Sequence, residues 1–319
     1  MAGGNSMGSD DIIRMLTEAG ASAAGIAAAG PVDTEAESLY RQWTADGRHA
    51  GMSYLEKYPD VRHDPRLLLE GAESIIVAAF NYFNRDNGRL RWARYALGRD
   101  YHEEIRERLN AVATAITDTT GAQCRVTVDT APLRERYWAV RAGVGFIGIN
   151  NQLIVPGAGS WCVLGEIITT LKLEPTAPPG HSSPTETGCL GCMRCVRACP
   201  GKALDGKGGM DARRCMSYLT IEHRGDWDPH TARTVHEAGR IYGCDVCQEV
   251  CPHNAAAHPT AIDGFIPRAG ILELGADDIA HMDQATFSRI FSHSAIKRAK
   301  LAGLQRNARG LNREETQLE

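Results

Sequence analysis

Seven cysteines in two short runs constrain this chain more than any other feature. The first run, GCLGCMRCVRACPGKAL (188–204), spaces four cysteines as C-x2-C-x2-C-x3-C-P, and the second, GCDVCQEVCPHN (243–254), places three cysteines before its proline. Bacterial two-cluster ferredoxins use such runs, and the fourth cysteine of a run ligates the other cluster. The spacing therefore predicts two [4Fe–4S] clusters, which together need eight thiolates.

Because the last cysteine of each run ligates the cluster of the other run, the ligands of both clusters can be assigned. The first cluster is expected to be held by Cys189, Cys192, Cys195 and Cys251, and three corners of the second by Cys199, Cys244 and Cys247. Cys215 lies inside the same module, sixteen residues after Cys199, and is expected to be the eighth ligand. Cys124 and Cys162 lie in predicted strands and are expected to be small apolar core residues.

Zinc and disulfides are the alternatives to clusters. Two C-x2-C pairs can hold a structural zinc ion, but four of the eight cysteines would then have no role. The first residues, MAGGNSMGSDDIIRML, lack the basic and apolar regions of a secretory signal, so we expect a reducing, cytoplasmic location, where disulfides are rare. No run of about 18 apolar residues predicts a membrane span.

Strand and helix patterns alternate before the cysteine module. SIIVAAFNYF (74–83) and CRVTVDT (124–130) are typical of strands, 100–116 and 134–143 of helices, and 151–173 of two strands joined by a Pro-Gly turn. The 319 residues therefore predict an α/β domain at 10–180, a two-cluster ferredoxin-type module at 181–260 and a basic helical segment at 261–319 that packs back on the core.

Common cofactor motifs are absent from the α/β segment. No G-x-G-x-x-G follows a predicted strand, no G-x-x-x-x-G-K-[ST] is present, and DPHTAR (228–233) has Arg233 where the cobalamin motif D-x-H-x-x-G requires glycine. The two clusters would pass single electrons from one to the other, but these motifs do not identify the group that receives the electrons.

Several long blocks resemble the epoxyqueuosine reductase family. They include HAGMSYLEKYPDVRHDPRLLLEGAESIIVAAFNY, YALGRDYHEEIRERL, VDTAPLRERYWAVRAGVGFIGINNQLI, GSWCVLGEIITTLKL and DARRCMSYLTIEHRG, in order over about residues 10–310. The resemblance implies a nitroreductase-like α/β domain that binds cobalamin without a protein histidine on cobalt. It also implies two [4Fe–4S] clusters, Cys215 as the eighth ligand, and reduction of epoxyqueuosine to queuosine at the wobble position of tRNA.

The resemblance also implies roles for individual residues. Asp129 matches the family's proton donor, Arg136 an active-site arginine, and Tyr101 and His102 a block near the substrate. Positions that contact or line the cobalamin match Arg62, Asp129, Leu153, Leu164 and Ser217. From the sequence alone, Asp129 could equally be a helix N-cap or turn residue, His102 a structural histidine, and the leucines plain core. Ile149 stands where the family usually has lysine.

One further partner is expected besides tRNA. An external reductant of the flavodoxin or ferredoxin type must load the clusters, and the chain is expected to be monomeric. Although the net charge is −4, the tail residues Lys297, Arg298, Lys300, Arg306 and Arg309 could contact tRNA phosphates, or form an ordinary solvated helix face. The alternatives to this function are a related cobalamin iron–sulfur reductase, such as a reductive dehalogenase, and a non-catalytic electron-transfer protein.

Overall fold

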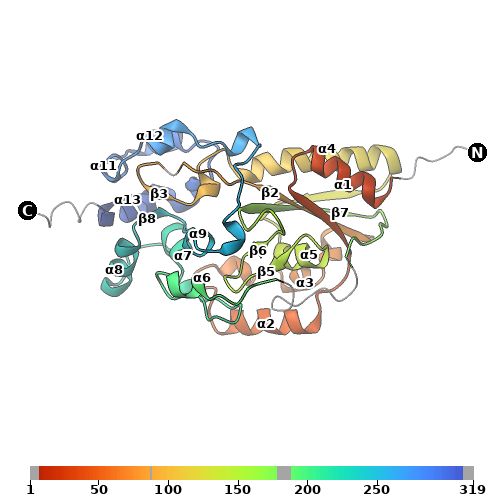
Figure 1. The fold of residues 1–319 in the computed structure, drawn as a ribbon, viewed down its shortest axis with the longest axis horizontal. Coiled ribbons are helices and arrows are strands. Elements are labelled where there is room, and N and C mark those ends of the chain that lie inside the picture. The colour runs from red at the N-terminus through yellow and green to blue at the C-terminus, as the bar shows by residue number, and fades with distance from the viewer. Residues whose placement is uncertain (1–6, 87, 178–187, 312–319) are drawn as a thin grey trace, which may run out of the picture.

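The computed structural model describes residues 7–86, 88–177 and 188–311. A half that contains the main sheet lies at one end of the molecule, and a mostly helical half that carries the cysteine runs lies at the other (Figure 1). The predicted combination of an α/β region with a cysteine-bearing module is confirmed. Among the described residues, no helix combines the length and the hydropathy that crossing a bilayer requires.

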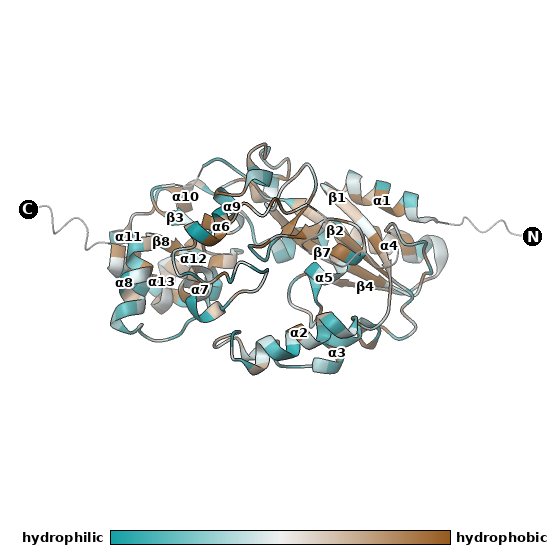
Figure 2. Cartoon of the chain, turned by 60° about the horizontal axis from the view of Figure 1, so that its bottom comes forward, coloured by the Kyte–Doolittle hydropathy of each residue, from teal (hydrophilic) through white to brown (hydrophobic). Residues whose placement is uncertain are grey.

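The main sheet has four strands, and every neighbouring pair is antiparallel. Its order is β1 (Ala23–Ala28), β2 (Ser74–Asn81), β7 (Cys162–Thr169) and β4 (Cys124–Thr127). The central strands β2 and β7 are apolar over most of their length (Figure 2). A strand that is covered on both faces reads as a continuous apolar run, which explains the run at 74–80.

Helices cover both faces of this sheet. Helices α1 (Ser9–Glu18) and α4 (Tyr101–Thr120) pack on the face that carries Ile76 and Phe80. Helix α5 (Glu135–Arg141) packs on the face that carries Ile75 and Val77, and α2 (Thr34–Ala45) and α3 (Pro59–His63) add partly buried apolar side chains there. The period of two along β2 therefore divides its side chains between two cores.

The Pro-Gly turn predicted within 151–173 joins strands of different sheets. Strand β6 (Leu153–Ile154) pairs with β5 (Phe146–Ile147) in a small two-stranded sheet, whereas β7 belongs to the main sheet. The turn is closed by an isolated bridge between Val155 and Gly159. The turn therefore leads the chain from the small sheet into the main sheet.

The cysteine-bearing half is built on short helices and one strand. It contains α6 (Arg194–Ala198), α7 (Met216–Ile221), α8 (Pro229–Ala238), β8 (Arg240–Tyr242) and α9 (Val246–Glu249). The C-terminal helices that follow are α10 (Ala269–Leu272), α11 (Ala276–Ala280), α12 (Gln284–Ile290) and α13 (Lys300–Leu311). Short 3₁₀ helices occupy Ser53–Leu55, Pro65–Leu68, Arg94–Ala96, Ala212–Arg214, Pro252–Asn254, Asp263–Phe265 and Ala295–Ala299.

The segment just before α4 leaves the half that contains the main sheet and packs in the core of the helical half. Strand β3 (Arg91–Trp92) pairs in parallel with β8, and Trp92 and Leu97 are buried in one cluster with Phe291 and Leu304. The C-terminal helices therefore share a core with residues from early in the chain, which the sequence did not indicate.

Hydrogen bonds connect the two halves at the second cysteine run. Gln248 of α9 donates to Ser160 O at 2.8 Å and to Tyr82 Oη at 3.1 Å, and both partners lie at ends of main-sheet strands. Tyr218 Oη of α7 accepts from Gly51 N at 3.0 Å. Buried polar networks of this kind fix the relative position of the two halves, because a shift would leave buried polar groups without hydrogen-bond partners, at a cost in free energy.

Two of the basic tail residues have structural partners. Arg306 is buried and donates to the backbone carbonyls of Leu219, His223 and Gly225. Arg298 pairs with Glu222 at 2.7 Å. Lys297, Lys300 and Arg309 are exposed. The five residues therefore do not form a single solvated face.

Candidate active site and cluster sites

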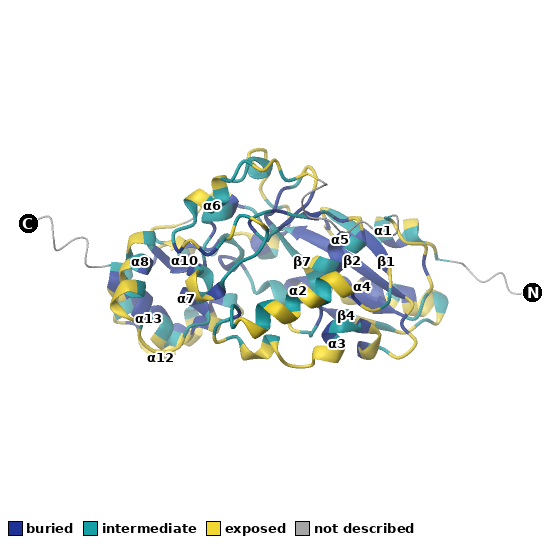
Figure 3. Ribbon diagram, turned by 90° about the horizontal axis from the view of Figure 1, so that it is seen from below, coloured by how far each residue is buried: buried dark blue, intermediate teal, exposed yellow. Residues whose placement is uncertain are grey.

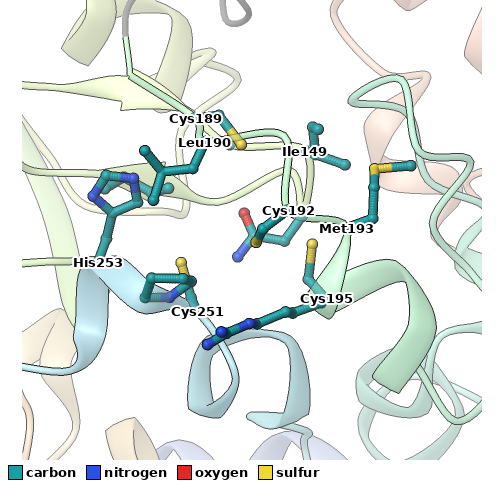
Figure 4. Close-up of a pocket in the computed structure, with 13 residues that line it drawn as sticks. Ile149, Cys189, Leu190, Cys192, Met193, Cys195, Cys251 and His253 are labelled. Carbon is teal, nitrogen blue, oxygen red and sulfur yellow. The ribbon is translucent and has the colours of Figure 1, made fainter.

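The first predicted set of cysteines surrounds one pocket. Cys189, Cys192 and Cys195 come from the loop before α6 and from α6 itself, and Cys251 follows α9 (Figure 4). Burial raises the pKa of the Cys195 and Cys251 thiols, and in each case Cys189 and Cys192 add to the increase. Four thiols that influence one another around a pocket match the ligand set predicted for the first cluster.

The second predicted set is also brought together. Burial raises the pKa of Cys244 to about 12 and that of Cys247 well above its ordinary value. Cys215 contributes to both increases, and Cys199 contributes to the pKa of Cys215 and of Cys247. Cys215 therefore lies with the second set, where the ligand count predicted it.

The other two cysteines lie in the main sheet. Cys124 is within 3.5 Å of Thr169 Oγ1, and burial raises the pKa of Cys162 to about 12. All ten cysteines are free thiols. Among the described residues, no three His, Cys, Asp or Glu side chains converge as a single metal ion requires. A four-iron cube places each thiolate on its own iron, so its ligands need not converge on one point.

Asp129 is held by two aromatic side chains from the start of α4. Tyr101 Oη donates a hydrogen bond to Asp129 Oδ2, and His102 Nε2 lies 3.5 Å from the same oxygen. Asp129 lies two residues beyond β4 with a φ of 54°, in the left-handed region that few residues other than glycine adopt. Strained backbone of this kind concentrates at functional sites.

A proton donor that acts near neutral pH would be expected to have a raised pKa, but the pKa of Asp129 is lowered. Burial alone would raise the pKa of Asp129, but hydrogen bonds from His102 and Tyr101 and the charges of His102 and Arg136 bring it below the ordinary value. The partners Asp100 and Asp129 raise the pKa of His102 to about 9 against the opposing effect of burial. At neutral pH the pair is therefore a carboxylate beside an imidazolium.

The Asp129 carboxylate is also open to a substrate. Protein atoms surround it on most sides, which is why burial affects its pKa, yet its side chain is 58% exposed. Solvent contact decides whether a substrate can reach an atom, so we regard the carboxylate as accessible. Arg136, the second residue of α5, is also exposed and donates to Asn151 O.

Two carboxyl groups behind Asp129 were not predicted from the sequence. Glu135 Oε1 accepts a hydrogen bond from Asp129 N, and burial raises the pKa of Glu135 to about 8. Glu166, fully buried in β7, accepts from Thr127 Oγ1 at 2.9 Å, and burial and the neighbouring Glu135 raise its pKa. A charged residue inside the apolar run CVLGEIITT was the available signal.

The residues expected to contact cobalamin are divided between the two halves. Leu153 and Leu164 are buried on the α5 side of the sheet, and Ser217 lies on α7, two residues after Cys215. Arg62 is buried and donates to the carbonyls of Tyr54 and Lys57, so part of its guanidinium holds the chain at 54–57.

Tyr54 indicates that these halves face one site. Its side chain packs against Arg298, and burial, Glu222 and Asp129 raise its pKa to about 12. Leu153 and Leu164 offer apolar side chains, and both ring nitrogens of His102 already face carboxylates, so these residues suit a cofactor that is held by apolar contact and without a histidine on its metal. Ile149 lines the first-cluster pocket (Figure 4).

Together, the two cysteine sets and the Asp129 site define an iron–sulfur oxidoreductase with an α/β domain. Two family models match the chain: "4Fe-4S double cluster binding domain" at residues 188–254, and "Epoxyqueuosine reductase QueG, DUF1730" at residues 62–130. The first match agrees with the two cysteine sets.

Individual relatives cover nearly the whole chain. An epoxyqueuosine reductase of Gloeobacter violaceus is 39% identical over 89% of this chain and 89% of its own, and one of Cyclobacterium marinum is 37% identical over 89% and 90%. A crystal structure of an epoxyqueuosine reductase with an epoxyqueuosine-modified tRNA stem loop aligns with a TM-score of 0.85 and 28% identity, over 95% of this chain and 80% of that one. The chain belongs to the epoxyqueuosine reductase family.

Proposed function

We propose that this protein reduces epoxyqueuosine to queuosine at the wobble position of tRNA, with cobalamin and electrons from two [4Fe–4S] clusters. The observation that carries the proposal is the Tyr101–Asp129–His102 arrangement in the same chain as two complete four-cysteine sets. Removal of an epoxide oxygen as water consumes two electrons and two protons and leaves a carbon–carbon double bond. The cysteine sets can deliver the electrons, and the Asp129 site can deliver protons.

The cofactor-binding residues in this proposal are Arg62, Asp129, Leu153, Leu164 and Ser217. When bound, cobalamin supplies a strongly reducing centre that can attack the epoxide carbon or pass electrons to it. The second cluster would lie next to it, because Cys215 and Ser217 are at the start of the same helix. The first cluster, bound by Cys189, Cys192, Cys195 and Cys251, would lie farther from the cofactor and receive electrons from outside.

Proton delivery follows from the protonation states of the site. His102 Nδ1 faces Asp100, and His102 Nε2 faces Asp129 Oδ2. The proton on Nε2 can therefore pass to Asp129 Oδ2 and from there to the epoxide oxygen. Tyr101 fixes the orientation of the Asp129 carboxylate, and the Arg136 cation can stabilise negative charge that develops on the departing oxygen. Asp129 thus remains the final donor, with His102 as the store of the proton.

Further properties belong to this proposal. The tRNA would approach the exposed Asp129, and a one-electron donor of the flavodoxin or ferredoxin type would load the clusters. Ten free thiols suit the reducing cytoplasm, and we propose a monomer. We propose three divisions of the chain: the α/β domain (10–180), the cluster module (181–260) and the C-terminal segment (261–319). The α/β domain includes the segment around Trp92 that packs on the C-terminal segment.

The proposal is tested by a direct assay. Protein reconstituted anaerobically with iron, sulfide and cobalamin is reduced chemically and mixed with tRNA that carries epoxyqueuosine, and the released nucleosides are analysed by mass spectrometry. We expect queuosine from the fully loaded protein, and none when cobalamin is omitted. Unchanged epoxyqueuosine in the presence of fully loaded, reduced protein would refute the proposed function.

A further inference from the structure

The two cysteine sets differ in their distance from the surface. In the first run, the residues around the ligands are exposed, among them Gly188, Leu190, Gly191, Arg194 and Arg197 (Figure 3). In the second run, Cys244 lies between the buried residues Gly243 and Asp245, and Cys247 precedes the buried Gln248. A protein that brings electrons can therefore approach the first cluster more closely than the second.

The surface at the first cluster is basic in a chain whose net charge is −4. Residues 188–214 contain six arginines and lysines but only two acidic residues. Of these two, Asp205 accepts from the backbone of Lys207 and Gly209, and Asp211 pairs with Arg213 at 2.7 Å. Within the described part of the chain, Arg194, Arg197 and Lys202 form no salt bridge, although all three are exposed.

An apolar side chain lies in the middle of these charges. Leu190, between the ligands Cys189 and Cys192, is 68% exposed and lines the cluster pocket together with Met193 and Arg194. A small apolar centre with a charged rim is typical of transient protein interfaces, and those of redox partners are at the small end of the size range. The residues that line this pocket include no phenylalanine, tyrosine or tryptophan that could stack on a nucleic-acid base, and the ring of His253 is engaged by the Gly188 carbonyl and by Phe146.

We propose that this surface, formed by Leu190, Met193, Arg194, Arg197 and Lys202, is the docking site of an acidic one-electron carrier protein. We name it the entry face. The inference rests on the proposed function, because it assigns the route by which electrons reach the Asp129 site. At each encounter the carrier loses one electron, and the first cluster gains it. Two encounters supply the two electrons that one epoxide consumes.

The test measures cluster reduction alone, in the reconstituted full-length protein without tRNA. The donor is a purified bacterial flavodoxin in its fully reduced state, which is an acidic protein, and the loss of cluster absorbance is followed by stopped flow. The double variant Arg194→Glu/Arg197→Glu is compared with Arg85→Glu/Arg289→Glu, which reverses two exposed arginines elsewhere on the surface. Because no turnover is measured, the result is readable even if the proposed tRNA reaction proves wrong.

At low ionic strength, we expect the entry-face variant to accept electrons from flavodoxin at least about tenfold more slowly than wild type, because electrostatic steering is lost. The difference should shrink as salt is added, and the control variant should match wild type. Reduction by the methyl viologen radical, a small cation, should be no slower than in wild type. A variant that slows both donors equally would indicate a damaged cluster and overturn the inference.

Two other results would also contradict it. Equal flavodoxin rates in wild type and the entry-face variant would show that the carrier docks elsewhere. Equal flavodoxin rates combined with weaker tRNA binding by the variant would assign the basic surface to nucleic acid. Leu190→Asp, which keeps both arginines, provides a second variant, and it should also slow flavodoxin while leaving the viologen rate unchanged.

Discussion

Glu166 places a carboxyl group in the centre of the main sheet, where its charge cannot be solvated. It is fully buried and accepts from Thr127, while its Oε1 atom has no hydrogen-bond partner among the described residues. Burial and the neighbouring Glu135 raise its pKa well above 4.5. At neutral pH we therefore expect Glu166 to be protonated, so that the site behind Asp129 holds a neutral group.

This protonation has a consequence for stability. Above pH 4.5 the unfolded chain releases this proton and the folded chain retains it, so the free energy of unfolding falls as the pH rises toward the folded pKa. Glu166→Gln mimics the neutral acid and removes the titration. We expect wild type to lose more thermal stability between pH 5 and pH 8 than Glu166→Gln. Equal losses would contradict a buried neutral carboxyl, and Glu70→Gln at the surface is the matched control.

Ile149, which stands where the family usually has lysine, lines the first-cluster pocket. A positive charge near a cluster favours its reduced, more negative state, so Ile149→Lys should raise the midpoint potential of one cluster. Ile149→Met is the uncharged control. Potentiometric titration followed by electron paramagnetic resonance checks this, and an unchanged potential would show that residue 149 does not influence the cluster.

At the scale of elements, the cysteine loops were the most predictable part of the chain. Three ligands of the first cluster lie within seven residues, so their spacing alone fixes how they wrap one cluster face. The strand at 74–83 and the helices at 100–116 and 134–143 were also recognisable from local periodicity. The carboxyl pair was not, because Glu135 lies on α5 and Glu166 on β7, and only the tertiary fold brings them together. The β3–β8 pairing is non-local in the same way.

Cys215, at the start of α7, tests the ligand count. Cys215→Ser should reduce the iron content well below eight per chain and change the spectrum of one cluster, because the second set would lose a thiolate. Cys124→Ser and Cys162→Ser, both in the main sheet, should retain full iron. The iron content of each variant and of wild type is measured after identical reconstitution. Loss of iron from Cys124→Ser but not from Cys215→Ser would show that the assignment is wrong.

Arg306 of α13 is expected to act on stability and not on tRNA binding. Its guanidinium donates to three backbone carbonyls and lies over the Trp227 ring. Arg306→Ala leaves those carbonyls without their donor and should cost about 2–4 kcal/mol of unfolding free energy. Arg309→Ala, exposed on the same helix, should cost almost nothing. Chemical denaturation measures both, and equal small losses would contradict a structural role for Arg306.

At the scale of the whole molecule, the arrangement of the two halves supports the direction of electron transfer that we propose. The first cluster lies under an exposed loop, the second lies among buried residues, and α7 leads from the second cluster toward the half that holds Asp129. The sequence predicted both ends of this route. It did not predict the C-terminal core shared with β3, nor the raised pKa of His102 beside the lowered pKa of Asp129.

The most direct measurement is the single-turnover rate of epoxyqueuosine reduction by chemically reduced, fully loaded Asp129→Asn. Asparagine preserves the shape but cannot pass a proton from His102, so the rate should fall about 10²–10⁴-fold while iron and cobalamin contents match wild type. The wild-type rate should decline as the pH rises past about 9, where His102 loses its proton. A wild-type rate from fully loaded Asp129→Asn would show that Asp129 does not deliver the proton.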